Sequence, residues 1–338
     1  MTKANRKHLI IILLVSFSIM VILGYKLFIG NKYTDSKIKV LSGNYGKYEN
    51  VVTYLDEDLN IIKQSHYKAG SIATNWDNPI LKDNHVYGIS SKQKDNNFIQ
   101  LNLNNGYVYN YSYAQAKAII NNYAYTNTNL VGKNAITRFD LTSKQKSLEK
   151  PVDGYIFKMV NYQNRLFAFT QEIDESKDNK DRFFVVEYDV NTLEEVSKLE
   201  IKDFAINIEP IINKDILYYI DSNSSTLNIL DMKTNKQTQT KINIDYLGNM
   251  KLYNDKLYFI PDTFLSEKDK NIIVTINLSN LKQDKISFSN DVTNFMLVDD
   301  KYYILHPNTI TIYDKELKII KEVKNLENDD LFNVTFLQ

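Results

Sequence analysis

Few side chains in this sequence are of the types that carry out catalysis or bind metals. There is no cysteine, and the four histidines are His8, His66, His85 and His306. Without Cys, a disulfide framework, a Cys-ligated zinc site and a thiol nucleophile are excluded. No Ser/His/Asp spacing, glycine-rich phosphate loop or His-x-x-x-His pair occurs. We therefore expect the three histidines beyond the N-terminal segment to occupy ordinary rim positions rather than a shared metal site.

An acidic segment is the first candidate for binding. Residues 174–181 contain four carboxylates, those of Asp174, Glu175, Asp178 and Asp181. Such oxygen ligands suit Ca²⁺, but two lysines in the segment neutralise part of the charge, and no glycine stands where an EF-hand loop needs one. We predict a solvated loop that contacts a ligand or partner. We expect no cofactor, with calcium as the alternative.

The only tryptophan, Trp76, is the second candidate. Aromatic side chains often anchor a ligand or partner, so Trp76 is a candidate binding residue. The competing interpretation is that the indole packs inside the core, which is the commoner role of a large aromatic side chain.

The N-terminus has the pattern of an export signal. Residues 1–8 contain three basic and no acidic side chains, and residues 9–29 are almost entirely apolar. This run is long enough to span a bilayer, and Ile22 is too bulky for cleavage after Gly24. We predict a cytoplasmic stub at 1–8, a signal-anchor transmembrane helix at 9–29, a linker at 30–37 and an extracytoplasmic domain at 38–338. Secretion after cleavage is the alternative.

The charge balance excludes some partners. The chain has 41 Lys and Arg residues against 41 Asp and Glu residues, and its N-terminal segment holds only basic ones. The predicted exported part is therefore mildly acidic, which argues against nucleic acid as a partner.

A strand-like segment that ends in Asp or Asn recurs seven times. Apolar and polar residues alternate along it, and a short polar turn follows. The final residues are Asp56, Asn102, Asp140, Asp189, Asp231, Asn277 and Asp314, about 43 residues apart. Asp and Asn suit this position because their side chains accept hydrogen bonds from backbone amides two residues further on. The pattern therefore predicts seven hairpins.

A second pattern precedes most of these hairpins. A turn with Asn or Asp leads into a strand rich in aromatic residues, as in residues 215–220 (DILYYI) and 255–260 (DKLYFI). Each unit supplies about four short antiparallel strands in about 43 residues, which is the length of a β-propeller blade. We interpret Tyr218, Tyr258 and Tyr303 as core between the blades rather than as a sugar-binding platform.

One unit carries a resemblance to a known class. The stretch DILYYIDSNSSTLNILD, residues 215–231, resembles a blade of the YWTD-like and quinoprotein-like bacterial β-propellers. As a repeat pattern, the resemblance covers about residues 40–338. It implies the fold and leaves the function open, because propellers host many unrelated activities. The chain lacks the Gly-His to Trp-Asp pairing of WD repeats and the Trp-rich motifs of dehydrogenases that use pyrroloquinoline quinone.

The repeat predicts an all-β propeller of seven four-stranded blades, with six as the alternative. We expect the C-terminal strand at 331–337 to close the ring by pairing with the first blade. The loops at 91–97, 174–181 and 263–271 lie between second and third strands, and so share one face with the blade-to-blade connections. Binding residues often lie on such loops when the scaffold is rigid.

Two functions fit these observations. The first is a membrane-anchored binding, scaffold or sensor-accessory module for a cell-surface or secreted protein partner. The second is an exported enzyme of the lactonase, lyase or quinoprotein-dehydrogenase type, with a metal or quinone at the channel mouth. The missing catalytic constellation favours the first. A small-molecule ligand stays open under both.

Overall fold

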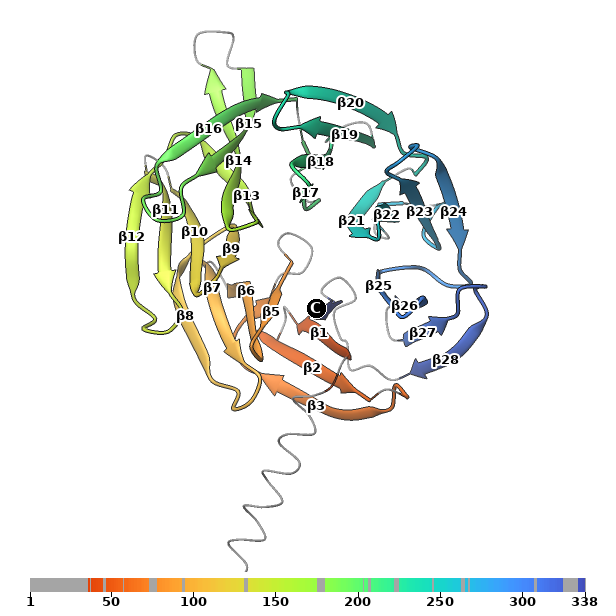
Figure 1. The fold of residues 1–338 in the computed structure, drawn as a ribbon. Coiled ribbons are helices and arrows are strands. Elements are labelled where there is room, and N and C mark those ends of the chain that lie inside the picture. The colour runs from red at the N-terminus through yellow and green to blue at the C-terminus, as the bar shows by residue number, and fades with distance from the viewer. Residues whose placement is uncertain are drawn as a thin grey trace, which may run out of the picture.

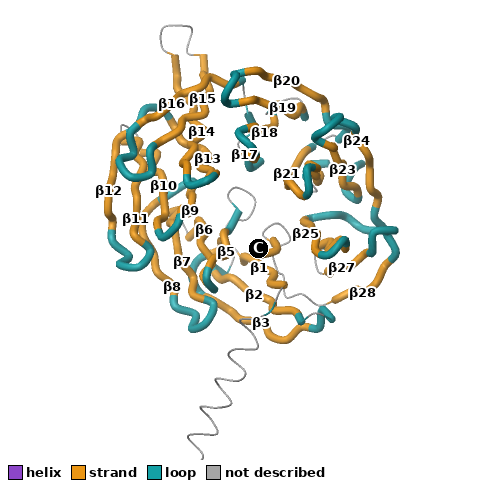
Figure 2. Tube along the Cα trace, viewed as in Figure 1, coloured by secondary structure: helices purple, strands orange, loops and turns teal. Residues whose placement is uncertain are grey.

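The computed structural model of the protein is a ring of seven antiparallel sheets around a central axis (Figure 1). It describes residues 36, 38–44, 47–56, 58–72, 78–92, 95–130, 133–174, 180–202, 204–205, 208–221, 225–244, 246–262, 265–266, 268–306, 309–324 and 334–337. The described residues form strands, loops and turns (Figure 2). The predicted seven-bladed β-propeller is confirmed, and the six-bladed alternative is wrong.

The blades follow one another around the ring, and the strands of each blade run in order from the axis outward. Blade 1 consists of β29 (Val334–Leu337), β1 (Ile38–Asn44), β2 (Glu49–Leu55) and β3 (Ile61–Tyr67). Blade 2 consists of β4 (Ser71–Ile72) with β5 (Ile80–Lys82), then β6 (His85–Lys92), β7 (Asp95–Asn102) and β8 (Val108–Tyr113). Blade 3 consists of β9 (Lys117–Ile120), β10 (Tyr123–Leu130), β11 (Lys133–Asp140) and β12 (Lys146–Pro151). Blade 4 consists of β13 (Tyr155–Tyr162), β14 (Arg165–Asp174), β15 (Lys180–Tyr188) and β16 (Glu195–Ile201).

The remaining three blades have the same order. Blade 5 consists of β17 (Ile211–Asn213), β18 (Ile216–Ile220), β19 (Thr226–Asp231) and β20 (Lys236–Lys241). Blade 6 consists of β21 (Leu247–Tyr253), β22 (Lys256–Pro261), β23 (Ile272–Asn277) and β24 (Gln283–Ser287). Blade 7 consists of β25 (Asn294–Val298), β26 (Lys301–Leu305), β27 (Thr309–Tyr313) and β28 (Ile319–Lys324).

The C-terminal strand closes the ring as predicted. β29 pairs antiparallel with β1, with Lys39 opposite Leu337 and Ser42 opposite Val334. The innermost strand of blade 1 thus comes from the far end of the chain. This pairing covers the edge that β1 would otherwise expose, because the hairpin partner of β1 lies on its other side.

The core lies between the blades. Each sheet is apolar on both faces, and the buried residues form seven clusters, one at each seam between neighbouring blades. Tyr218, Tyr258 and Tyr303 are buried in these clusters, which confirms their predicted role. Burial of one large apolar side chain stabilises the fold by about 1.5–3 kcal/mol, so the seams supply most of the stabilisation.

Tight turns make up one face of the ring, which we call the turn face. Five two-residue turns join first to second strands, and both residues of each turn have φ between 45° and 61°. These are the turns at residues 83–84, 163–164, 214–215, 254–255 and 299–300. Asn and Asp tolerate this left-handed conformation, and paired turns of this kind match the twist of a hairpin.

The turns between third and fourth strands also lie on the turn face, and each of the seven predicted Asp and Asn residues either ends a third strand or directly follows it. In five of them the side chain accepts a hydrogen bond from the amide two residues further on, as predicted. In blades 1 and 7, Asp56 and Asp314 instead accept from the amide four residues further on, at 2.7 and 2.8 Å. The turn is one residue shorter there, since the amides of Asp56 and Asp314 donate to carbonyls four rather than five residues further on, and the same side chain closes it.

The opposite face is the loop face, which carries the blade-to-blade connections and the turns between second and third strands. Two predicted loops are shorter than expected. β6 and β7 remain paired out to residues 92 and 95, and β14 and β15 remain paired out to residues 174 and 180. The β14–β15 hairpin therefore projects beyond the ring outline (Figure 1).

The predicted signal-anchor helix at 9–29 and linker at 30–37 fall almost wholly outside the described residues. Within the part of the chain that the structure describes, no helix is long and apolar enough to cross a membrane.

Candidate functional site

Buried Asn side chains hold the connections of the loop face. Asn127 of β10 accepts hydrogen bonds from the amides of Gln115 (3.2 Å) and Ala116 (2.6 Å), and its Nδ2 donates to the carbonyl of Ile156 (2.9 Å). One side chain thus ties the connections on both sides of blade 3. Asn50 serves the connection between blades 1 and 2 in the same way. These bonds fix the described connections beside blade 3 and between blades 1 and 2 despite their irregular backbone.

On blades 6 and 7, neighbouring loops are bonded to one another. The backbone of β21 runs so close to β22 that a Cβ at Gly248 would lie 2.6 Å from the carbonyl oxygen of Pro261. This close approach requires glycine and brings the preceding connection against blade 6. As a result, the carbonyl of Tyr246 accepts a hydrogen bond from the amide of Asp262 at 2.8 Å.

The bonding continues from blade 6 to blade 7. The amides of Phe288 and Val292 donate to the carbonyls of Asn271 (2.8 Å) and Lys270 (2.7 Å). Residues 288–292 are in turn bonded to blade 7 through His306. We refer to these loops of blades 6 and 7, which comprise Tyr246, Asp262, Leu265, residues 288–292 and His306, together as the 6–7 surface.

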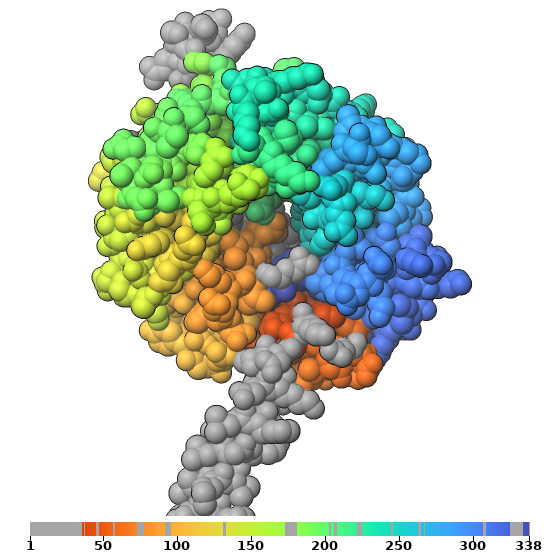
Figure 3. Space-filling view, in the orientation of Figure 1, coloured from red at the N-terminus to blue at the C-terminus, as the bar shows by residue number. Residues whose placement is uncertain are grey.

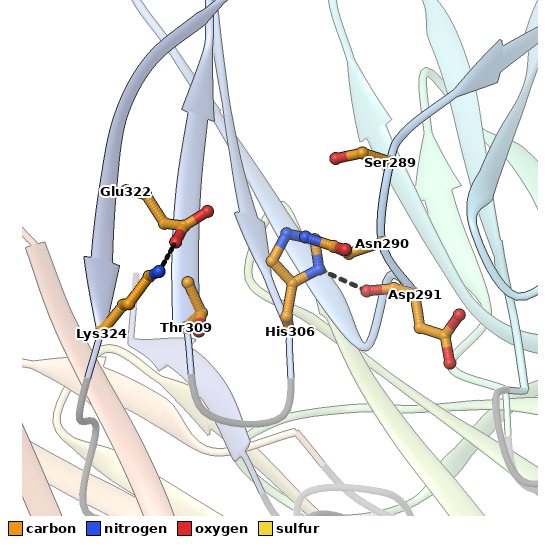
Figure 4. Close-up of a pocket in the computed structure, with 7 residues that line it drawn as sticks. All are labelled: Ser289, Asn290, Asp291, His306, Thr309, Glu322 and Lys324. Atoms are coloured by element: carbon orange, nitrogen blue, oxygen red, sulfur yellow. Dashed lines mark hydrogen bonds and ion pairs between the residues drawn. The ribbon is translucent and has the colours of Figure 1, made fainter.

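A pocket opens in the 6–7 surface. It has a volume of about 580 Å³ and lies between the blade 6–7 connection and the outer strands of blade 7 (Figure 4). The residues that line it are Ser289, Asn290, Asp291, His306, Thr309, Glu322 and Lys324. Every one of these side chains is polar or charged, so the pocket suits a ligand that exchanges hydrogen bonds rather than an apolar one.

His306 forms the wall of this pocket and is buried. Its Nδ1 lies against the carbonyl of Asp291 and its Nε2 is 3.0 Å from the hydroxyl of Thr311. Burial lowers the pKa of His306, although Asp291 and Glu322 act in the opposite direction. The ring is therefore neutral at pH 7, with Nδ1 donating to the carbonyl and Nε2 accepting from the hydroxyl. Both ring nitrogens have hydrogen-bond partners within the protein, so the role of His306 in the pocket is structural.

The outer rim of the pocket carries an ion pair. Lys324 Nζ lies 2.9 Å from Glu322 Oε1, and this contact raises the pKa of Lys324. The pair is largely exposed, so it contributes little to stability and is available to a partner. No group of three metal-ligating side chains occurs among the described residues.

A second polar group crosses the axis near the loop face, and we call it the channel network. Lys117 Nζ of β9 donates to the carbonyl of Asn78 at 2.6 Å, and the side-chain amide of Asn78 donates to Glu209. Asn78 lies in blade 2, between β4 and β5, and Glu209 precedes blade 5, so their contact joins blades on opposite sides of the ring. The space-filling view shows an opening near the axis of this ring (Figure 3). Polar groups thus bridge the channel at this end.

Lys251 of β21 is coupled to this network through the charge of Glu209. Its Nζ donates to Asn294 Oδ1 (2.8 Å) and to the carbonyl of Phe295 (2.6 Å). Asn294 donates to the hydroxyl of Thr335 at 2.9 Å, which links blade 7 to the closing strand β29. Burial lowers the pKa of Lys251 to about 8, and the carboxylate of Glu209 raises it in part.

The sequence-predicted binding residues do not gather at the pocket. Trp76, Glu175 and Asp178 lie outside the described residues. Asp174 ends β14 and pairs in register with residue 180, while Asp181 is exposed on β15. Asp174 and Asp181 are thus strand residues at the tip of the blade 4 hairpin, away from blade 7.

The histidines are also apart. His66 lies on the outer strand β3, His85 begins β6 at the turn face, and His306 follows β26 at the loop face. Sequence reasoning missed the pocket because its walls come from separate strands. The one signal was His306 at the end of a predicted strand, and nothing in the sequence linked it to Asp291 or Glu322.

No family model matches the chain, and no curated protein matches it in sequence. Solved structures do match it in fold. A functionally unknown protein from Desulfotomaculum acetoxidans has a TM-score of 0.57 at 10% identity, over 88% of this chain and 98% of its own. BamB from Moraxella catarrhalis has a TM-score of 0.52 at 13% identity, over 88% and 94%. The dihydro-heme d1 dehydrogenase NirN has a TM-score of 0.51 at 12% identity, over 86% and 73%.

These similarities confirm the predicted resemblance to bacterial β-propellers at the level of the fold. At such low identity they carry no information on activity, because propellers with one architecture perform unrelated tasks.

Proposed function

We propose that the protein is a membrane-anchored, extracytoplasmic binding module, and that a protein partner docks on the 6–7 surface. The anchor is the apolar segment at 9–29 with its basic flank at 1–8. The positive flank would stay in the cytoplasm and place the propeller outside.

One observation carries the docking surface. Tyr246 and Leu265 expose 51% and 49% of their surface on bonded loops of the 6–7 surface. Aromatic and aliphatic side chains on a rigid backbone are effective interface anchors, because little conformational entropy is lost when they are buried. The polar pocket beside them provides the hydrogen-bonding groups of a typical interface rim.

The chemistry of the channel favours binding over catalysis. The alternative, an enzyme with a metal or quinone at the channel mouth, would need several carboxylate or amide oxygens that converge on one open position. Among the residues that the structure describes, the channel network contributes one carboxylate, that of Glu209, and bonds it to Asn78. The oxygens that a metal would use are engaged with side-chain and backbone donors of the protein itself.

A double variant tests the docking surface. We expect Tyr246→Ser with Leu265→Ser to weaken partner binding by about tenfold or more, since each anchor of this kind contributes roughly 1–2 kcal/mol. The matched control is Tyr107→Ser, because Tyr107 is 56% exposed but lies in a turn of the turn face. Quantitative co-purification of the full-length variants from cells measures the difference. Equal loss for the control and the double variant would contradict the proposal.

The anchor is tested separately. We expect the full-length protein in the membrane fraction and its propeller open to protease added to intact cells. A protein recovered with the cytoplasmic fraction and protected from protease would contradict the proposed location.

A further inference from the structure

The pocket in the 6–7 surface has hydrogen-bonding groups that the protein itself does not use. Among the described residues, the side-chain amide of Asn290 and the hydroxyl of Thr309 take part in no hydrogen bond, although the backbone carbonyl of Thr309 accepts one from the amide of His306 at 2.8 Å. Glu322 and Lys324 are bonded to each other and keep further oxygen lone pairs and N–H groups. The pocket thus offers donors and acceptors side by side.

The charges at the pocket are balanced. Lys324 Nζ lies 2.9 Å from Glu322 Oε1, so the ammonium and the carboxylate on this wall compensate each other. Asp291 turns its backbone carbonyl to the ring of His306, and its carboxylate points away from the ion pair (Figure 4). A ligand with a net charge would meet a like charge beside the opposite one. A neutral ligand with hydroxyl groups can bond to both, and hydrogen bonds to ionised groups are the stronger ones.

The loop wall of the pocket is held in place without a ligand. The hydroxyl of Ser289 lies 3.1 Å from that of Tyr313, which is buried in the seam between blades 6 and 7. At the other end of this loop, the amide of Val292 donates to the carbonyl of Lys270 at 2.7 Å.

The strand wall is fixed by the sheet of blade 7. Lys324 is opposite Thr309 and Glu322 is opposite Thr311 in the register of β27 and β28, so these side chains share one face of the blade. A site whose walls are already in place avoids the cost of ordering them when a ligand binds.

We propose that this pocket binds a neutral sugar. The side chains that contact the sugar are those of Asn290, Thr309, Glu322 and Lys324. Each hydroxyl of a sugar both donates and accepts hydrogen bonds, which matches the mixture of amide, hydroxyl, carboxylate and ammonium groups here. The volume of about 580 Å³ lies within the range of about 300–1,000 Å³ that is typical of small-molecule sites.

Saturation-transfer NMR titration of the full-length protein tests the site, in a polyoxyethylene detergent because this has no sugar headgroup. The neutral probes are glucose, galactose and N-acetylglucosamine. Their charged counterparts are glucuronate, galacturonate and glucosamine. We expect saturable binding of at least one neutral probe and weaker binding of its charged counterpart.

The substitution Glu322→Gln distinguishes direct contact from a structural role. It keeps the shape of the side chain but removes its charge, so it should weaken binding of the neutral probe by about tenfold. It also leaves the charge of Lys324 uncompensated, so binding of the uronates should become stronger. The matched control is Glu316→Gln, because Glu316 also pairs with a nearby lysine, Lys315 at 3.7 Å, but in the β27–β28 turn on the turn face. We expect this control to bind as the wild type does.

Three results would overturn the proposal: no saturable binding of any neutral probe, tighter binding of the charged probes to the wild type, or equal effects of the two substitutions. The site goes beyond the proposed docking of a protein, since neither Tyr246 nor Leu265 lines the pocket. The double variant Tyr246→Ser with Leu265→Ser should therefore retain sugar binding, which separates a failure of the sugar site from a failure of protein docking.

Discussion

The turn face and the loop face of the ring differ in the sequence separation of the hydrogen bonds that fix their backbones. On the turn face, the Asp or Asn at the end of each third strand accepts hydrogen bonds from amides no more than four residues away. On the loop face, Asn127 bonds backbone groups 11, 12 and 29 residues away. The first face is organised locally and the second by tertiary contacts.

This difference determines where binding can develop. A turn closed by its own side chain leaves little room for insertions, whereas a connection held from a distance can vary in length as long as its anchor remains. The 6–7 surface, the pocket and the channel network all lie at the loop face. The following predictions test this contrast, from the largest expected effect to the smallest.

The largest effect should come from Asn127→Ala. This substitution removes the hydrogen-bond acceptor of the Gln115 and Ala116 amides, at about 1–3 kcal/mol for each amide, while the carbonyl of Ile156 keeps its hydrogen bond from Asn129. We expect the free energy of unfolding to fall by about 3 kcal/mol or more in equilibrium urea denaturation. Asn191→Ala is the matched control, because Asn191 is exposed in a turn of the turn face. Its substitution should lower the free energy of unfolding only slightly. A loss for Asn191→Ala as large as that for Asn127→Ala would contradict the contrast.

The second prediction concerns the stability that His306, on the loop face, contributes in mild acid. The folded state binds a proton on His306 less readily than the unfolded chain, since burial lowers the pKa of His306 from its usual 6.5. The associated stability is therefore complete above about pH 6.5 and falls as the pH drops below it. The groups that face the ring are the carbonyl of Asp291, the hydroxyl of Thr311 and the carboxylate of Glu322.

Urea denaturation between about pH 5 and pH 7 measures this dependence. We expect His306→Gln to be less stable than the wild type at pH 7 but to lose the change in unfolding free energy over this range. A wild-type profile that is flat there, or an unchanged slope in His306→Gln, would show that His306 is not the responsible group.

The smallest change in stability should come from the aspartates that close turns on the turn face, and it should appear at low pH. Hydrogen bonds from the backbone amides of Ser143, Thr192 and Thr234 lower the pKa values of Asp140, Asp189 and Asp231, respectively, below the usual 3.8. The stability they contribute is complete above about pH 4 and is lost as the pH falls through the lowered values. Asn102 and Asn277 close the equivalent turns without a titratable group.

The three-fold substitution Asp140→Asn, Asp189→Asn and Asp231→Asn should thus be nearly neutral at pH 7 and should flatten the acid limb of the stability profile below about pH 4. Thermal melts across that range measure it. A large loss of stability at pH 7 would mean that the negative charge, and not the hydrogen bond, closes these turns.

The same contrast explains how much of the molecule the sequence could predict. Asp231 and its six counterparts act on amides a few residues away, so their spacing alone predicted seven blades. The pairing of β29 with β1 could be predicted because a ring leaves one strand to close it. The site could not be predicted. His306 meets Asp291 across 15 residues and Asn78 meets Glu209 across 131, and no local pattern records such contacts.

In the acidic segment, the sequence predicted a loop where the structure has paired strand residues. Four carboxylates in eight residues stood out in the sequence, but β14 and β15 remain paired out to residues 174 and 180. Backbone pairing over this length used residues that the polar composition had assigned to a loop. Whether that hairpin contacts a partner stays a prediction.

Site-specific photo-cross-linking in living cells tests the central claim most directly. A photoreactive phenylalanine analogue is placed at Tyr246, at Leu265 or, on the turn face, at Tyr107. These three side chains expose similar fractions, 51%, 49% and 56%. We expect one and the same cross-linked protein from Tyr246 and Leu265, and none from Tyr107. Cross-links from Tyr107 alone, or equally from all three positions, would contradict a partner that docks on the 6–7 surface.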